Sequence, residues 1–263
     1  MNESEILTVR LEEPEESPGV IRYIASSSIG GRSSQQDSLF VGEKGQEILA
    51  VVCDGMGGMN GGERASELAV QMLAEAFFTQ EIPSVPAFYR DIVYKADDGV
   101  YLLQDGGKPM GAGTTIVSVI IRDNGLYWLS VGDSKIYIYR KGKMICPVVE
   151  HNYRMILNRM LAEGKIDRTA YNNELPKAEA LVSYLGMGGL KYMEINQNPF
   201  LLEVGDQILL CSDGLYKSLD EEEILDILDH RMNLDVKAKM LIDKALANGG
   251  AKQDNTSIVL IQA

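Results

Sequence analysis

The chain has 263 residues, of which 45% are hydrophobic and 24% charged, and its formal net charge is −13 at pH 7. This acidic balance argues against nucleic-acid binding, because proteins that bind a phosphate backbone concentrate positive charge. Three cysteines and two histidines argue against a disulfide framework and against the common Cys/His zinc sites. No apolar run reaches the roughly 18–20 residues of a membrane span, and the N-terminus lacks the pattern of a signal peptide. We therefore expect a cytoplasmic protein without a membrane partner.

The N-terminal third of the sequence predicts strands followed by a helix. Residues 1–18 are acidic and contain two prolines, which indicates a tail or a loosely attached extra strand, and residues 19–263 are expected to form one domain. Strands are expected at 20–26, 37–41 and 46–53. From residue 62 onward the apolar residues recur at the spacing of a helix, at Ala65, Leu68, Ala69, Met72, Leu73, Ala76 and Phe77.

The middle of the chain predicts a second helix and then hairpins. The helix is expected at 84–104, with two prolines near its start, where proline is tolerated. Strands are expected at 114–122, 126–132 and 135–140. The pair Asn124-Gly125 predicts a hairpin turn between the first two of these strands. Lys141-Gly142 predicts another turn.

The last part of the chain starts with an irregular segment at 147–190, which contains a short predicted helix near 153–163. Strands at 191–196 and 206–211, helices at 220–230 and 234–247, and a strand at 256–262 complete the prediction. This order lacks the regular strand–helix alternation of a parallel sheet. It favours an α+β fold in which two sheets pack together, with a helix pair on each outer face.

Aspartates lie at the ends of four predicted strands. Asp54, Asp133 and Asp213 end apolar runs, and Asp254 precedes the last one. A single Asp-Gly pair usually marks only a turn. If these strand ends converge, however, two carboxylates ~4 Å apart repel by roughly 4 kcal/mol at an effective dielectric constant of ~20. Because hard divalent cations prefer oxygen ligands and offset this repulsion, the sequence predicts a magnesium or manganese site.

Other catalytic chemistries lack their residues in this sequence. A cysteine phosphatase needs an arginine six positions after its cysteine, and none of Cys53, Cys146 and Cys211 has one. A Ser-His-Asp hydrolase would need His151 or His230, and the G-x-S-x-G turn is missing. The glycine-rich phosphate loop GxxxxGK[ST] is also missing.

Six motifs follow one another along the chain: GGRSSQQDS (30–38), VVCDGMGG (51–58), GAGTT (111–115), VGDSKIYIY (131–139), LLCSDGL (209–215) and QDNTSIVLI (253–261). In this order and spacing they resemble the bacterial branch of the protein phosphatase 2C family, the metal-dependent serine/threonine protein phosphatases. The resemblance runs from about residue 20 to the C-terminus.

The resemblance implies a four-layer α-β-β-α sandwich, with two central, mostly antiparallel sheets and the metal site at one end of them. By position, Asp54 would bridge two Mn²⁺ or Mg²⁺ ions and Gly55 would offer its carbonyl to one. Asp213 and Asp254 would complete the ligands of the other ion, both ions being tightly bound, and Asp133 with Asp213 would hold a weaker third. Residues 147–190 would form a flap beside the site.

Two further residues receive roles from the resemblance. Asp37 would orient metal-bound water without binding the metal itself. Arg32 would bind the substrate phosphate, a role that suits the multi-donor guanidinium group. The family's usual arginine after Gly-Asp-Ser is Lys135 here, which weakens a bidentate contact at that position.

The implied reaction is the hydrolysis of phosphoserine and phosphothreonine by direct attack of a metal-bridging hydroxide, without a covalent intermediate. The implied partners are phosphorylated proteins and a cognate serine/threonine kinase, and a monomer is expected. One alternative is an inactive pseudo-phosphatase that serves as a binding or sensing module, but it requires a lost ligand. Another, a metal-binding structural domain, explains the aspartates but not Arg32.

Overall fold

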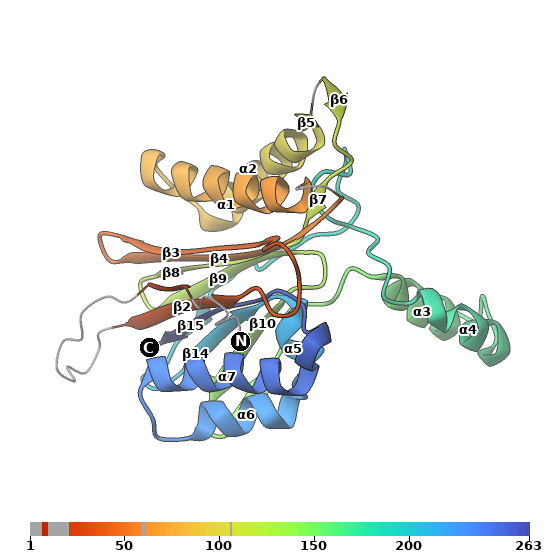
Figure 1. The fold of residues 1–263 in the computed structure, drawn as a ribbon. Helices are drawn as coiled ribbons and strands as arrows, with labels where there is room; N and C mark the ends of the chain where they lie inside the picture. Colours follow the sequence, from red (N-terminus) through yellow and green to blue (C-terminus); the bar gives the residue numbers. More distant parts are fainter. Residues whose placement is uncertain (1–6, 10–20, 59–60, 106) are drawn as a thin grey trace.

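The computed structural model describes residues 7–9, 21–58, 61–105 and 107–263. In this part of the chain, two antiparallel sheets pack face to face between two layers of helices (Figure 1). The predicted α+β sandwich is therefore confirmed. The positions of the two sheets matter for function, because the predicted site residues lie where their central strands end.

The first sheet has the strand order β1-β2-β15-β14-β10-β11. These strands span Leu7–Val9, Arg22–Ser28, Thr256–Gln262, Gln207–Cys211, Lys135–Arg140 and Lys143–Ile145. The short strand β1 pairs with β2, and the remainder of the predicted tail at 1–18 lies outside the described residues.

The second sheet has the strand order β12-β9-β8-β4-β3, and β13 and β7 pair with β9 and β4. Its strands span Glu194–Ile195, Gly125–Val131, Ile116–Arg122, Glu47–Met56, Asp37–Lys44, Phe200–Leu201 and Gly113–Thr114. A separate small hairpin joins β5 (Gln104–Asp105) and β6 (Lys108–Pro109).

Helix pairs cover the outer faces of both sheets, as the sequence predicted. Helices α1 (Gly61–Thr79) and α2 (Val85–Tyr101) lie on the second sheet, and α6 (Glu221–Asp229) and α7 (Leu234–Gly249) lie on the first (Figure 1). Ser84 caps α2 by accepting a hydrogen bond from the Ala87 N–H, and Asp220 forms a capping box with Glu223 on α6. No helix within the described ranges combines the length and the hydropathy needed to span a membrane.

The central strands β4 and β14 are buried on both faces. Along β4, Leu49, Val51 and Cys53 pack toward α1 and α2, whereas Ile48, Ala50 and Val52 pack between the sheets. The strand β14 alternates in the same way: Leu209 and Cys211 pack toward α6 and α7, and Ile208 and Leu210 pack between the sheets. This alternation explains the continuous apolar runs before Asp54 and Asp213, because successive side chains of a strand point to opposite faces.

One predicted turn is shifted by a residue. The β8–β9 ladder pairs Arg122 with Gly125, so the turn residues are Asp123 and Asn124, with φ values of 51° and 58°. The predicted hairpin is therefore confirmed, and its turn begins one residue earlier than predicted. Both turn positions of this hairpin type need positive φ, which Asp and Asn tolerate, and Gly125 instead makes room for Pro199. The predicted turn at Lys141-Gly142 is confirmed by the pairing of Arg140 with Lys143.

The segment between β11 and β12 projects beyond the sandwich (Figure 1). It contains the predicted short helix, α3 (Tyr153–Ala162), and also α4 (Arg168–Glu174) and a 3₁₀ turn (Leu175–Lys177) that the sequence reading missed. The short helix α5 (Asp213–Tyr216), also missed, follows β14 directly.

Candidate metal centre

Asp54 lies near the end of β4 and is held through its backbone by the start of β8. Thr115 Oγ1 accepts a hydrogen bond from the Asp54 N–H at 3.0 Å, and the Thr115 N–H donates to the Asp54 carbonyl at 2.9 Å. The Thr114 hydroxyl donates to the same carbonyl at 2.9 Å. These bonds fix the position from which the Asp54 carboxylate extends, and Asp37 on β3 is its partner in the ladder.

Asp37 connects the two sheets at this end. Its carboxylate accepts a hydrogen bond of 2.7 Å from the Ser212 hydroxyl, which in turn accepts the Ser257 N–H at 3.0 Å. Ser212 directly precedes Asp213, so β3, β14 and β15 are joined beside the site. Asp37 is buried, with 7% of its surface exposed.

The two Asp-Gly pairs of the sequence have the same steric reason for their glycine. A Cβ on Gly55 would lie 2.1 Å from the Gly62 carbonyl oxygen at the start of α1. A Cβ on Gly214 would lie 2.0 Å from the Asn255 carbonyl oxygen. Another backbone segment packs directly against each glycine, so any side chain there would displace the aspartate before it.

Asp254 and Arg32 meet at the edge of the site. The guanidinium of Arg32 forms an ion pair with the Asp254 carboxylate, while 58% of the Arg32 side chain remains exposed. Asn255 holds the loop that carries Arg32, because its amide donates to the carbonyls of Ile29 and Ser34 at 2.9 and 3.1 Å. Arg32 therefore lies beside the carboxylates and open to solvent.

Asp133 follows β9 and is linked to the root of the projecting segment. The Gly132 N–H donates to His151 Nδ1 at 3.1 Å, and the His151 N–H donates to the Gly132 carbonyl at 2.8 Å. At the other end of the segment, Leu185 exchanges two backbone hydrogen bonds with Thr114. Both ends of the segment are thus attached to strands that carry site residues.

Carboxylates gather at this end with few cations to offset them. Burial, followed by the charges of Asp37 and Asp213, raises the pKa of Asp54 well above its ordinary value. Burial also raises the pKa of Asp37 to about 7 and that of Asp133 to about 6, with Asp213 adding to both. The structure therefore brings these four residues and Asp254 together, as the sequence predicted.

The donor set fits a hard divalent cation. It consists of carboxylate and carbonyl oxygens, and their mutual repulsion is what a bound cation relieves. Within the described residues, no three acidic, cysteine or histidine side chains stand at the spacing of a formed metal site. Instead, Arg32 pairs with Asp254, and Lys217 pairs with Asp213.

Several residues that shape this site were missed by the sequence reading. Lys217 lies two residues after the motif LLCSDGL (209–215), where its charge was a visible signal. Asp97 on α2 is 1% exposed and accepts hydrogen bonds of 2.7 and 2.8 Å from the Gly186 and Gly189 N–H groups, beside Leu185. No local pattern identifies the partners of Asp97, because they lie about ninety residues away in sequence.

The cysteines offer no alternative nucleophile. Burial raises the pKa of Cys53, Cys146 and Cys211, which keeps the thiols protonated. The His151 ring is buried and accepts the Gly132 N–H through Nδ1, and His230 lies at the end of α6.

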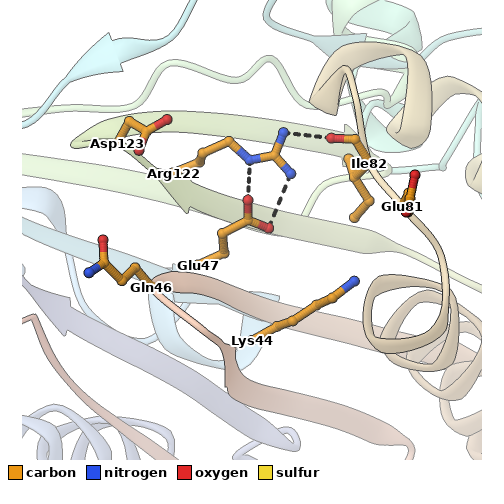
Figure 2. A pocket seen from close by; sticks show the side chains of 7 residues that line it. All are labelled: Lys44, Gln46, Glu47, Glu81, Ile82, Arg122 and Asp123. Carbon is orange, nitrogen blue, oxygen red and sulfur yellow. Dashed lines mark hydrogen bonds and ion pairs between the residues drawn. The ribbon is translucent and has the colours of Figure 1, made fainter.

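A hollow of about 480 Å³ lies at the opposite end of β3 and β4 (Figure 2). Figure 2 shows the guanidinium of Arg122 paired with Glu47 and bonded to the Ile82 carbonyl. Lys44 donates to the carbonyls of Phe77 and Gln80, at the end of α1. These cations already have protein partners, and their contacts connect the β3–β4 and β8–β9 hairpins to the end of α1 and the α1–α2 loop.

Comparison with known proteins agrees with this geometry. The family profile described as Protein phosphatase 2C matches residues 26–248. The serine/threonine phosphatase stp of Listeria welshimeri is 29% identical over 226 residues, which cover 83% of this chain and 86% of that protein.

Solved structures of serine/threonine phosphatases have the same fold as this chain. The serine/threonine phosphatase of S. agalactiae superimposes with a TM-score of 0.80 at 26% identity, over 93% of this chain and 100% of that one. The catalytic domain of the phosphatase PstP in complex with two manganese ions has a TM-score of 0.73 at 26% identity, over 92% and 97% of the two chains. With this fold and the match over residues 26–248, the chain belongs to the protein phosphatase 2C family and is a serine/threonine protein phosphatase.

Proposed function

We propose that this chain hydrolyses phosphoserine and phosphothreonine in proteins at the carboxylate cluster, with Mn²⁺ or Mg²⁺. The observation that carries the proposal is the juxtaposition of Asp54 with Asp37 and Asp213, whose charges and burial raise the pKa of Asp54. Such an arrangement is stabilised by divalent cations. The similar catalytic domain of PstP was solved in complex with two manganese ions, which supports divalent cations as the metal.

In this proposal Asp54, Gly55, Asp213 and Asp254 hold two cations, and Asp133 with Asp213 forms a further, weaker site. When bound, the cations would activate water for direct attack on phosphorus and offset charge on the phosphoryl oxygens. Every other part of the work falls to the chain itself.

The chain's own residues would bind and orient the reactants. Arg32 can leave Asp254 and donate to the phosphoryl oxygens, since its side chain is largely exposed. Asp37 is held by Ser212 and can accept a hydrogen bond from the attacking water. Thr114 and Thr115 keep the Asp54 backbone in place while its carboxylate binds.

We further propose that residues 19–263 form one catalytic domain and that residues 147–190 act as a flap beside the site. The attachments of His151 to Gly132 and of Leu185 to Thr114 support this, because they place both flap roots next to site residues. Phosphorylated proteins are the proposed substrates, and the protein is proposed to act in the cytoplasm as a monomer, opposite a serine/threonine kinase.

The test is an assay of the purified protein with a phosphothreonine peptide, before and after removal of metals with EDTA. We expect phosphate release that depends on added Mn²⁺ or Mg²⁺. A protein that binds Mn²⁺ but releases no phosphate from any phosphopeptide would instead be a pseudo-phosphatase.

A further inference from the structure

Lys217 places a positive charge between two of the carboxylates. Its Nζ lies 2.6 Å from Asp213 Oδ2 and 4.0 Å from Asp133 Oδ2. These are the two carboxylates to which the proposed function assigns a further cation. An ammonium group in this position offsets part of the negative charge that a bound metal cation would offset there.

The backbone beneath Lys217 is firmly held. Its N–H donates to the Asp213 carbonyl at 2.9 Å, and Leu215 in the same turn is fully buried. The next residue, Ser218, donates its hydroxyl to Gln253 Oε1 at 2.7 Å, and the Gln253 amide donates to the Gly214 carbonyl at 2.7 Å. The Lys217 side chain therefore starts from a fixed point, four residues beyond Asp213.

The two carboxylates are much less exposed than the lysine. The exposed fractions of the side chains are 17% for Asp213, 7% for Asp133 and 45% for Lys217. The carboxylates are thus confined, whereas the lysine head can move into water along its flexible stem. Lys217 can occupy this position and can also be displaced from it.

A divalent cation bound by Asp133 and Asp213 would draw on the two carboxylates that Lys217 now contacts, because such cations bind carboxylate oxygens directly. It would also face a like charge at contact distance. The nearby cation Lys135 does not share this role, since its Nζ lies 2.9 Å from Glu150 and over the Tyr216 ring.

We propose that Lys217 is a built-in competitor of the cation between Asp133 and Asp213 and lowers the affinity of this site for a divalent cation. The inference rests on the proposed function, because it assumes that the neighbouring carboxylates bind cations. It depends on where the Lys217 ammonium group lies and not on a change in its protonation.

The test is a titration with Mn²⁺ in which the electron paramagnetic resonance signal of free Mn²⁺ counts the bound ions. Lys217→Met and Lys217→Gln both remove the charge, and we expect either variant to bind a third Mn²⁺ about tenfold more tightly than the parent. Lys217→Arg keeps the charge and should behave as the parent does. Adding Asp133→Asn to Lys217→Met should abolish the gain.

Lys95→Met is the matched control. Lys95 forms an ion pair of 2.6 Å with Asp91, four residues before it, on an exposed face of α2. Lys95→Met should leave all Mn²⁺ affinities unchanged. An equal third-site affinity in the parent and in both neutral Lys217 variants overturns the inference, while the two tight sites of the parent keep the proposed function intact. A parent that binds no Mn²⁺ overturns both.

Discussion

Asp37 and Asp54 face each other as partners at the end of the β3–β4 ladder. Asp37 is buried and Asp54 is half-buried, and the charge of Asp37 contributes to the raised pKa of Asp54. Two antiparallel strands therefore bring together acidic groups that would be more stable apart. Their mutual repulsion is the reason to expect that the site needs bound cations.

Activity should require Mn²⁺ or Mg²⁺ and be lost on chelation, because the clustered carboxylates need cations both to stay together and to act. Binding should also raise the melting temperature. At a free cation concentration 100 times the Kd, a single site stabilises the native state by about 2.7 kcal/mol. Phosphopeptide hydrolysis and thermal unfolding with and without EDTA measure both effects, and full activity after exhaustive chelation contradicts the proposal.

Arg32→Ala should weaken phosphate binding and leave Mn²⁺ binding intact. Arg32 must leave Asp254 to bind phosphate, so its loss removes no cation ligand. A charge-assisted contact of this kind contributes about 1.5–3 kcal/mol, which should appear mainly as a higher KM. Arg32→Lys, which keeps the charge but not the planar group, should be intermediate. Parent-like kinetics for Arg32→Ala would assign Arg32 a structural role only.

Substitution of Asp54 or Asp213 should affect Mn²⁺ binding and turnover differently from substitution of Asp133. Asp54→Asn or Asp213→Asn should lose both tight Mn²⁺ binding and turnover, since these two groups contact each other at the centre of the cluster. Asp133→Ala should keep two cations but lower turnover of a phosphopeptide about 10–100-fold, because it removes a ligand of the proposed further cation. Calorimetric titration paired with phosphopeptide assays checks this. Full turnover in Asp133→Ala, or loss of all binding, is the contrary result.

His151 should make the protein less stable in mild acid. Burial lowers its pKa from 6.5 to about 4, so between these values the unfolded chain binds the proton and the native state does not. Stability therefore falls as the pH decreases below 6.5, by at most about 2 kcal/mol between pH 6.5 and 5. The neighbouring carboxylate of Glu150 is paired with Lys135 and leaves His151 unassisted.

Urea unfolding at pH 7 and pH 5 measures this effect. His151→Asn keeps an acceptor for the Gly132 N–H and should lose less stability than the parent over this range. The site aspartates titrate in both proteins and cancel in the difference. His230→Asn, at the exposed end of α6, should retain the parent's pH dependence. If His151→Asn also retains the parent's pH dependence, His151 is not the cause of the loss of stability in mild acid.

Asp97→Ala should destabilise the protein and disturb the metal site. It removes the buried carboxylate that accepts from the Gly186 and Gly189 N–H groups, and a hydrogen bond to a charged group contributes about 1.5–3 kcal/mol. The loop next to Leu185 should then hold Thr114 less firmly, and Mn²⁺ affinity should fall. Asp98→Ala, on the exposed face of the same helix, is the control. A destabilised variant with parental Mn²⁺ affinity limits Asp97 to a structural role.

Most of the secondary structure and the acidic residues of the site could be predicted from the sequence, because both depend on neighbouring residues. The apolar runs before Asp54 and Asp213 predict strands buried on both faces, and the stripe from Ala65 to Phe77 predicts the inner face of α1. The position of an aspartate at a strand end is likewise a local property. The short helices α4 and α5 were missed because neither has enough turns to show an apolar period.

Only the tertiary structure decided which of these residues meet. The contacts of Ser212 with Asp37 and of Asp97 with Gly186 join residues 175 and 89 positions apart, so they depend on how the two sheets and α2 pack. The same packing places Lys217 against both Asp213 and Asp133, although only the first of these is near it in sequence. By itself, the sequence determined that acidic groups end the central strands. The packing of the strands determined which charges offset them, because electrostatic energy depends on distance in space and not along the chain.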